Sequence, residues 1–329
     1  MARLAGVSAK TVSRVLNGEA HVREQKREAV ESAIATLGYL PNLAARSLAS
    51  SRSFVVGLIS PCVQNFRFYY HELHSRTIRA CRERGLHLTI EEVDTRSRDM
   101  IPQLEQSLRQ MHFEGVILTS PVCDSCKILD LLDRLGIRYV RISPTTRASQ
   151  SDSVSADYVQ AAALLAKHFW DLGHRRIAIA LMNPRGRNLL KDALVKLGGD
   201  PKQIQSLPLD LNQAPIGAGR DIAAALLSQR TPPTAVFAFN DAIAAGLIGY
   251  ALEHGARVPG DLSVAGFDDG DVAQATWPPL TTLRQPLDEM AKAAVSLLVE
   301  RAARGKVRKI ICPVELVVRG STGSAGTLK

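Results

Sequence analysis

The fold is decided by Leu4-Ala-Gly-Val-Ser-Ala-Lys-Thr-Val-Ser-Arg-Val-Leu-Asn-Gly18, a stretch with the signals of a short amphipathic helix. Ser8 is a favourable N-cap, because its hydroxyl can accept hydrogen bonds from the free amides of a first helical turn. Gly18 follows the last periodic residue and is typical of a helix end. Apolar side chains recur between them at the spacing of one helix face, at Val12, Val15 and Leu16. We therefore predict a helix here, preceded by a tight turn at Gly6.

The opposite face of this predicted helix carries polar groups that suit DNA. It holds Lys10, Ser13, Arg14 and Asn17. An Arg guanidinium can bond to O6 and N7 of a guanine in the major groove, and a Lys can reach the same acceptors or a phosphate. Polar outer faces are also the rule for ordinary surface helices. The spacing alone therefore leaves both interpretations open.

The composition indicates a globular protein of more than one domain. Its 329 residues are enough for two or three domains. No run approaches the roughly 20 apolar residues of a membrane span. The first residues show no signal-peptide pattern, so we expect a cytoplasmic protein. The net charge of +9 favours a polyanionic partner, and residues 1–53 hold eight basic residues against four acidic ones.

Residue types that carry catalysis or bind metals form no recognisable set. The five cysteines are an odd number, which disfavours a disulfide framework. Cys123 and Cys126 form a CxxC, but no second pair follows at zinc-ligand spacing, so we interpret them as plain thiols. Gly217-Ala-Gly219 lacks the third glycine of a dinucleotide fingerprint. His174 lies in an expected turn before a strand. We expect no enzyme activity, no cofactor and no metal site.

Two further segments complete the N-terminal region. Apolar residues recur on one face of Glu24–Leu37, which predicts a helix that ends at Gly38 and closes a small three-helix core. The residues on this face are Ala29, Val30, Ala33, Ile34 and Leu37. Asn42 is a capable N-cap for a short helix over 42–49, which is too short to be stable alone in water.

From Phe54 onward, apolar runs of strand length alternate with amphipathic helical patterns. We predict strands at 54–59, 86–93, 115–119, 138–142, 176–182, 234–239, 262–267 and 309–318, and a segment at 280–283 that leads back toward the first lobe. We predict helices near 68–84, 98–111, 125–135, 157–172, 188–197, 216–227, 241–254 and 286–303. Continuous apolar strands between helices are typical of parallel sheets covered on both faces. The pattern therefore predicts two doubly wound lobes with return crossings between them.

Polar residues directly follow two of these strands. Asn240 and Asp241 come after the strand that ends at Phe239, and Asp268 and Asp269 come after another. Ligands of such sheets bind at the carboxyl ends of strands, and carboxylate and amide groups suit the hydroxyls of a sugar. Asn and Asp also favour turns and helix caps, so a capping role is the other interpretation, for Asp241 in particular.

Taken together, these segments resemble the LacI/GalR family of bacterial transcription regulators. The resemblance rests on Leu4–Gly18, Gly38-Tyr-Leu-Pro-Asn-Leu-Ala-Ala-Arg-Ser-Leu48, Phe239-Asn-Asp241, Val264-Ala-Gly-Phe-Asp-Asp269, Pro278-Pro-Leu-Thr-Thr282 and Glu315-Leu-Val-Val-Arg-Gly-Ser321. These motifs stand in the family's order over nearly the whole chain.

The resemblance implies an α/β protein with an all-α helix-turn-helix domain at its N-terminus. It implies a DNA-binding domain at 1–40, a hinge helix and linker at 41–53, and a bilobed, periplasmic-binding-protein-like domain for effector binding and dimerisation at 54–329. The N-lobe would comprise about 54–153 and 284–312, and the C-lobe about 154–283 and 313–329. The family's first helix begins several residues before the position of Met1, so we expect only about Met1 to Ala5 of it.

The resemblance also assigns site residues. It implies DNA contacts from Ser8, Ala9, Lys10, Thr11, Ser13, Arg14, Asn17, Asn42, Ala45 and Leu48. Leu48 would be an apolar wedge that bends the operator at its centre. On the effector side, the matching residues are Asn240, Asp268 and Gln285. Ser143 and Arg187 stand at or beside positions where the family carries a ligand-binding Asp and Arg. Tyr69 and Tyr70 open the first effector-domain helix, where an aromatic side chain either stacks on a ligand ring or packs in the core.

We therefore expect a homodimeric repressor of carbohydrate genes that binds a pseudo-palindromic operator and a sugar-like effector. The alternative is a cytoplasmic sugar-binding or sugar-modifying protein with a basic arm. The missing signal peptide argues against a transport protein, and the missing catalytic set argues against a kinase or hydrolase.

Overall fold

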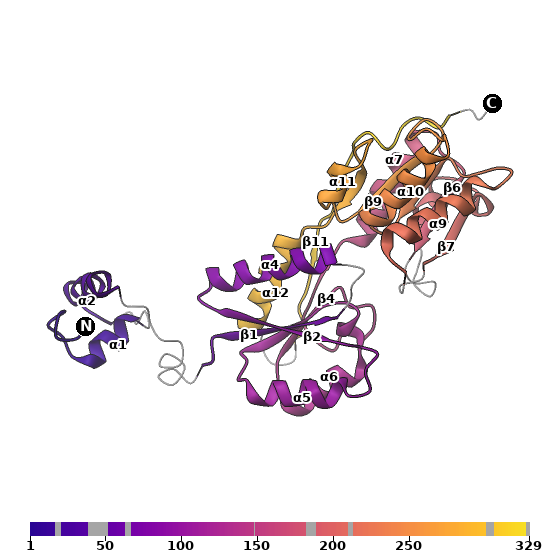
Figure 1. Cartoon of the computed structure of the whole chain (residues 1–329). Helices are drawn as coiled ribbons and strands as arrows, with labels where there is room; N and C mark the ends of the chain where they lie inside the picture. Colours follow the sequence, from indigo (N-terminus) through magenta and orange to yellow (C-terminus); the bar gives the residue numbers. More distant parts are fainter. Residues whose placement is uncertain are drawn as a thin grey trace. The chain divides into compact units, whose positions relative to one another are not determined.

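A computed structural model describes residues 1–16, 21–38, 52–62, 67–147, 149–181, 189–209, 213–300 and 306–326. The chain divides into two compact units, Met1–Phe54 and Val55–Lys329 (Figure 1). Within the described ranges, no helix combines the length and the apolar character that crossing a membrane requires.

The N-terminal unit is helical. Helix α1 (Ala9–Leu16) begins after Ser8, whose Oγ accepts a hydrogen bond from Thr11 N at 3.2 Å, which confirms the predicted cap. Helix α2 (Glu24–Leu37) ends at Gly38 in the left-handed conformation. A single turn precedes them, with Ala5 N bonded to Met1 O at 2.9 Å and a turn at Gly6 (φ +62°). Gly18 and the predicted helix over 42–49 lie outside the described residues.

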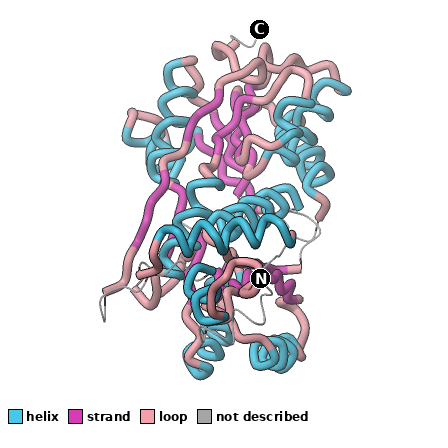
Figure 2. The backbone as a smooth tube through the Cα atoms, turned by 90° about the vertical axis from the view of Figure 1, so that its left-hand side faces the viewer, coloured by secondary structure: helices cyan, strands magenta, loops and turns pink. Residues whose placement is uncertain are grey.

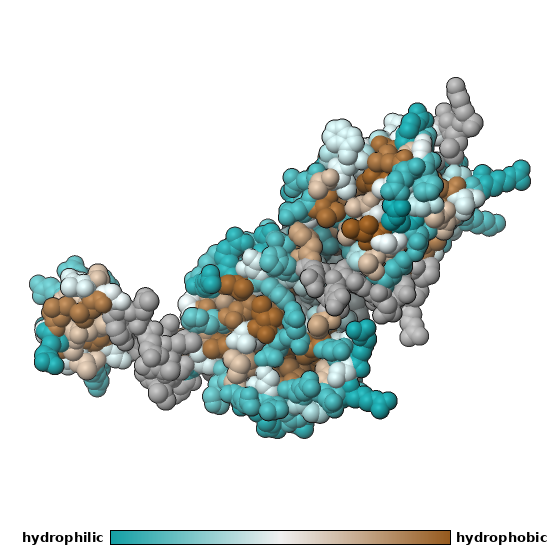
Figure 3. Space-filling model, viewed as in Figure 1, coloured by the Kyte–Doolittle hydropathy of each residue, from teal (hydrophilic) through white to brown (hydrophobic). Residues whose placement is uncertain are grey.

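The core of this unit is small. Val12, Val15 and Val30 are buried, and residues including Val7 and Ile34 pack partly against them. Leu37 was predicted to join this core but is 52% exposed, because it lies one turn beyond Ile34 at the end of α2. Figure 3 shows apolar side chains at the surface of this unit. A unit of this size buries little apolar area and is only marginally stable alone.

The second unit holds two six-stranded sheets, each the centre of one lobe. The first sheet has the order β11-β5-β4-β3-β1-β2, and all its pairings are parallel. Its strands are β1 (Val55–Pro61), β2 (His87–Val93), β3 (Gly115–Leu118), β4 (Tyr139–Ile142), β5 (Ser153–Ala156) and β11 (Lys309–Cys312). Figure 1 shows α4 (Arg67–Glu83) and α12 (Leu287–Val299) on one face, and α5 (Met100–Gln110) and α6 (Cys126–Leu135) on the other.

The second sheet has the order β12-β10-β9-β8-β6-β7, in which β12 alone runs antiparallel to its neighbour. Its strands are β6 (Ile177–Leu181), β7 (Ile204–Pro208), β8 (Ala235–Ala238), β9 (Ser263–Phe267), β10 (Thr281–Arg284) and β12 (Glu315–Val317). Its helices are α7 (Tyr158–Asp171), α8 (Leu189–Lys196), α9 (Pro215–Leu227), α10 (Asp241–Glu253) and α11 (Asp271–Ala275). Figure 2 shows helices on both sides of these strands.

Glycines explain how closely α9 and α10 approach each other. A Cβ on Gly219 would overlap the carbonyl oxygen of Ile243, and a Cβ on Gly246 would overlap that of Ile216. Gly219 therefore serves helix packing.

The predicted alternation of strands and helices is confirmed, but the chain's last predicted strand is wrong as one element. The segment 309–318 forms β11 in the first sheet and β12 in the second, because Pro313 between them has no amide hydrogen for a sheet. Strands β5 and β7 and helix α11 were not predicted. The chain crosses between the lobes after β5, after β10 and after β11.

Candidate functional site

Two predicted site residues meet at the carboxyl ends of β9 and β10. Asp268 directly follows β9 and Gln285 directly follows β10. Gln285 Nε2 donates a hydrogen bond to Asp268 Oδ1 at 2.6 Å. The backbone of Asp268 has φ +105°, which residues other than glycine rarely adopt. The two neighbouring strands thus bring together an amide and a carboxyl group that lie far apart in the sequence.

The Asp268 carboxyl lies where a negative charge is unfavourable. Burial, followed by the nearby Asp241 carboxylate, raises the pKa of Asp268 to about 8, although the hydrogen bond from Gln285 opposes the shift. The Gln285 side chain is 8% exposed, and its Oε1 has no hydrogen-bond partner among the described residues. A buried amide oxygen without a partner is costly unless a donor reaches it. The pair can therefore receive hydroxyl groups of a ligand.

Aromatic side chains from both lobes lie beside this pair, Tyr69 from the first and Tyr158 from the second. Tyr69 lies in the first turn of α4, and burial raises the pKa of its phenol. The neighbouring groups Tyr158, Tyr70 and Asp268 raise this pKa further, by less than burial does. Tyr158 opens α7, and its ring stacks on Phe267 with centroids 6.1 Å apart. These rings offer apolar faces beside polar hydroxyls, the combination that binds a sugar ring.

Ser143 joins the site through Tyr158, whereas Tyr70 is already bonded. The Tyr158 hydroxyl donates to Ser143 Oγ at 3.0 Å, and burial raises the pKa of Tyr158 to about 12. The Tyr70 hydroxyl donates to the carbonyl oxygen of Ser120 at 2.6 Å. Its ring lies edge to face against Tyr69, with centroids 5.2 Å apart. Tyr70 thus supports Tyr69.

Asn240 and Asp241 hold the second lobe together at the same edge of its sheet. Asn240 Oδ1 accepts from Ile243 N at 2.9 Å and caps α10, so the capping interpretation applies to Asn240. Asp241 Oδ1 accepts from Thr282 Oγ1 at 2.6 Å, and its Oδ2 accepts from Gly270 N at 2.7 Å. Burial raises the pKa of Asp241 to about 7. Arg187 lies outside the described residues.

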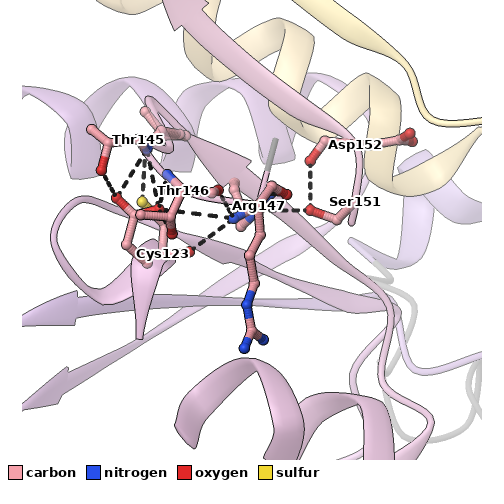
Figure 4. Close-up of polar contacts among 9 residues, drawn as sticks. Cys123, Thr145, Thr146, Arg147, Ser151 and Asp152 are labelled. Carbon is pink, nitrogen blue, oxygen red and sulfur yellow. Dashed lines mark hydrogen bonds and ion pairs between the residues drawn. The ribbon is translucent and has the colours of Figure 1, made fainter. Parts of the chain in front are cut away.

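A buried arginine that the sequence analysis missed fixes the loop after Ser143. Arg141 in β4 is fully buried, and its Nε donates at 2.9 Å to the Oγ of Ser151, which Figure 4 labels beside Thr146 and Arg147. Its guanidinium also donates to the carbonyl oxygens of Thr146 at 3.0 Å and Arg147 at 2.5 Å. The sequence could have revealed this role, because an Arg inside an apolar strand needs buried hydrogen-bond partners.

Asp124 holds the same loop from the opposite direction. Its carboxylate accepts the backbone amides of Thr145 and Thr146 at 2.9 to 3.1 Å and both their hydroxyls at 2.5 and 3.0 Å. Burial acts to raise the pKa of Asp124, but these hydrogen bonds outweigh it and the pKa is lowered. Arg141 Nη1 lies 3.8 Å from Asp124 Oδ1. The loop that carries Ser143 is therefore held by two charged groups.

In the N-terminal unit, α1 exposes most of the residues expected to contact DNA. Ala9, Lys10 and Arg14 are exposed, and Thr11 and Ser13 are partly exposed. Val12 and Val15 are buried on the other side of the helix. The Ser8 hydroxyl serves as the cap. The remaining expected contacts lie outside the described residues: Asn17, Asn42, Ala45 and Leu48.

The cysteines and His174 have structural surroundings. Cys123 is buried, Cys126 is exposed, and both are free thiols. His174 is buried, with Nδ1 bonded to Thr234 Oγ1 at 2.9 Å and Nε2 to the carbonyl oxygen of Gly323 at 3.0 Å. In the part of the chain that the structure describes, no group of three His, Cys, Asp or Glu side chains is placed to hold a metal ion.

Comparison with known proteins gives matches at both ends of the chain. Residues 1–42 match the model of bacterial regulatory proteins of the lacI family, and residues 166–322 match a periplasmic binding protein-like domain. The transcriptional regulator DegA of Bacillus subtilis is 32% identical, over 99% of this chain and 98% of DegA. The ribose operon repressor of Escherichia coli is 30% identical, over 98% of each chain.

Solved structures show the same fold. A complex of the transcriptional regulator CelR with cellobiose superimposes with a TM-score of 0.70 at 28% identity, covering 97% of this chain and 98% of that one. A lac repressor dimer bound to operator and the anti-inducer ONPF superimposes with a TM-score of 0.77 at 24% identity, covering 98% and 97%. The fold and these relatives thus define a transcriptional regulator with a helix-turn-helix domain and a periplasmic-binding-protein-like domain. The chain belongs to the LacI family of bacterial regulatory proteins; it is a DNA-binding transcriptional regulator and not an enzyme.

Proposed function

We propose that this protein is a homodimeric repressor of genes for carbohydrate uptake or catabolism, controlled by a sugar-like effector that binds between its lobes. The observation that carries the proposal is the Asp268–Gln285 pair beside Tyr69 and Tyr158, with an unpartnered Gln285 Oε1. Among the relatives, one is a ribose operon repressor and another was solved with cellobiose. The protein acts in the cytoplasm, where its operator is accessible.

The chemistry of the site favours a neutral polyol with an apolar ring face. Gln285 Oε1 accepts a hydroxyl hydrogen, and a neutral Asp268 carboxyl both donates and accepts. Tyr69 and Tyr158 supply ring faces for the C–H surface of a sugar. Ser143 adds a hydroxyl from the first lobe. Because these groups come from both lobes, the ligand binds one arrangement of the lobes better than another, and this difference in affinity is what drives the response.

On the DNA side, the proposal places α1 in the major groove of each half-site. Lys10 and Arg14 contact base edges or phosphates, and the two-fold axis of the dimer matches the pseudo-palindromic operator. Leu48 of the hinge segment is proposed to enter the minor groove at the operator centre.

Fluorescence anisotropy on DNA fragments from around the protein's own gene tests this function. Titrations are run at two salt concentrations, with and without ribose, cellobiose and glucose. We expect tight binding to one palindromic fragment and a change in affinity with one sugar. The Asp268→Ala variant should keep operator binding and lose the sugar response. Weak, sequence-independent binding that falls steeply with salt would contradict the proposal, because it reports phosphate contacts alone.

A further inference from the structure

A close contact joins the two lobes beside the candidate site. Phe68 lies in the first turn of α4 in the first lobe, and Gly270 directly precedes α11 in the second lobe. A Cβ built on Gly270 would lie 2.7 Å from Phe68 Cε1 and 2.9 Å from its Cδ1 and Cζ. Such distances are shorter than any stable carbon–carbon contact. Only glycine at position 270 therefore leaves room for the ring where it lies.

The backbone under the ring is fixed within the second lobe. Gly270 N donates to Asp241 Oδ2 at 2.7 Å, and Asp241 is itself 4% exposed and bonded to Thr282. The preceding residue, Asp269, is ion-paired with Arg284 at 2.7 Å and with Arg319 at 2.6 Å. Gly270 thus moves with the second lobe. If the lobes separate at this point, the Phe68 ring must leave Gly270.

The contact also adjoins the site on both sides. Phe68 directly precedes Tyr69, and Gly270 lies two residues after Asp268. Any change in lobe spacing at the site therefore changes this contact as well. We propose that the Phe68 ring on Gly270 holds the two lobes in the arrangement that this structure shows, and that these two residues position the lobes across the candidate effector site. The proposal goes beyond the sugar response, since it does not depend on which molecule occupies the site.

The distance between the lobes measures this effect directly in the full-length protein. Spin labels are attached at Gln110→Cys, the exposed last residue of α5, and at Ser228→Cys, the exposed residue directly after α9. The exposed native thiols, Cys62 and Cys126, are replaced by Ser. Labelled chains are mixed with excess unlabelled chains, so that pulsed dipolar spectroscopy reports distances within one protomer. No effector or DNA is added.

We expect one narrow distance distribution for the parent protein and a shift to longer, broader distances for Phe68→Ala. Gly270→Ala should give the same shift, because its Cβ displaces the ring, and the double variant should add nothing further. Leu252→Ala, which removes a similarly exposed apolar side chain from α10, is the control and should leave the distribution unchanged.

An unchanged distribution in folded Phe68→Ala overturns the proposal. A shifted distance distribution in Gly270→Ala with an unchanged one in Phe68→Ala also overturns the proposal. The glycine substitution would then change the distance by distorting the second lobe, and not by displacing the Phe68 ring. Neither result depends on DNA binding or on a sugar, so failure here is distinguishable from failure of the proposed function.

Discussion

At the scale of single residues, Asp268 makes the stability of the effector unit depend on pH. The pKa of its carboxyl is 3.8 in an unfolded chain, and burial raises this pKa to about 8 in the folded protein. The stabilisation associated with the neutral carboxyl is therefore fully present below about pH 4 and is lost as the pH rises toward 8. Asp241, with its pKa raised to about 7, acts in the same direction.

Replacing Asp268 by Asn removes one of these titrating groups. The difference in unfolding free energy between Asp268→Asn and the parent protein should move in favour of the variant by at least about 1 kcal/mol from pH 5 to pH 9. One unit of pKa shift corresponds to about 1.4 kcal/mol. Urea denaturation at the two pH values checks this. Asp261→Asn is a suitable control. Hydrogen bonds from Arg257 lower the pKa of Asp261 to about 2, so this carboxyl does not titrate between pH 5 and pH 9. A constant difference between parent and Asp268→Asn across the range would contradict the argument.

The Arg14→Ala variant tests whether α1 contacts base edges or only the phosphate backbone of DNA. If its guanidinium bonds to a guanine, Arg14→Ala should lose roughly 1–3 kcal/mol of discrimination at one base pair of each half-site. Anisotropy titrations on operators with single base-pair changes measure this loss. An equal weakening on every sequence would instead identify Arg14 as a phosphate contact. Arg23→Ala, just before α2, serves as the comparison.

At the scale of elements, the loop after β4 depends on charges inside the first lobe. Truncating Arg141 leaves several buried carbonyl acceptors without their donor and removes the positive charge beside Asp124, so Arg141→Ala should cost about 3–5 kcal/mol of unfolding free energy. Arg109→Ala, which breaks an exposed pair with Glu105 on α5, should cost less than about 1 kcal/mol. Chemical denaturation compares the two variants. Equal, small losses would show that the loop does not rely on Arg141.

Local signals in the sequence were enough to predict several elements and part of the site. The Ser8 cap, the end of α2 at Gly38 and the alternation of strands and helices depend on near neighbours, and each is confirmed. The family resemblance assigned Asp268 and Gln285 to the effector site, and the two side chains are hydrogen-bonded because the carboxyl ends of adjacent parallel strands share an edge of the sheet. Their contact with an effector stays a prediction.

The remaining features depend on residues that are far apart in the chain. Asp241 is bonded to Thr282 and Gly270 rather than acting as the cap, and the sequence around it contains no sign of those partners. Most of the hydrogen-bond acceptors around Arg141 are backbone carbonyl oxygens, which every residue has. The position of Phe68 against Gly270 depends on how two lobes meet, which no local pattern encodes.

At the scale of the whole molecule, three crossings tie the lobes together and limit how they can move. The chain passes between them after β5, after β10 and after β11. All three connections are short, so the lobes can pivot about them but cannot drift apart. A pivot of this kind moves Phe68 and Tyr69, at the start of α4 in the first lobe, relative to Gly270 and Asp268 in the second.

The split of 309–318 into β11 and β12 also has a consequence for how the protein is made. Strand β11 pairs with β5 at the edge of one sheet, and β12 pairs with β10 at the edge of the other. A ribosome produces the chain from its N-terminus, so neither sheet can be completed until the segment 309–318 has been synthesised. Until it emerges, β5 and β10 present open edges that invite pairing with other chains. A nascent chain that stops short of Lys309 would therefore contain two unfinished sheets and no finished lobe.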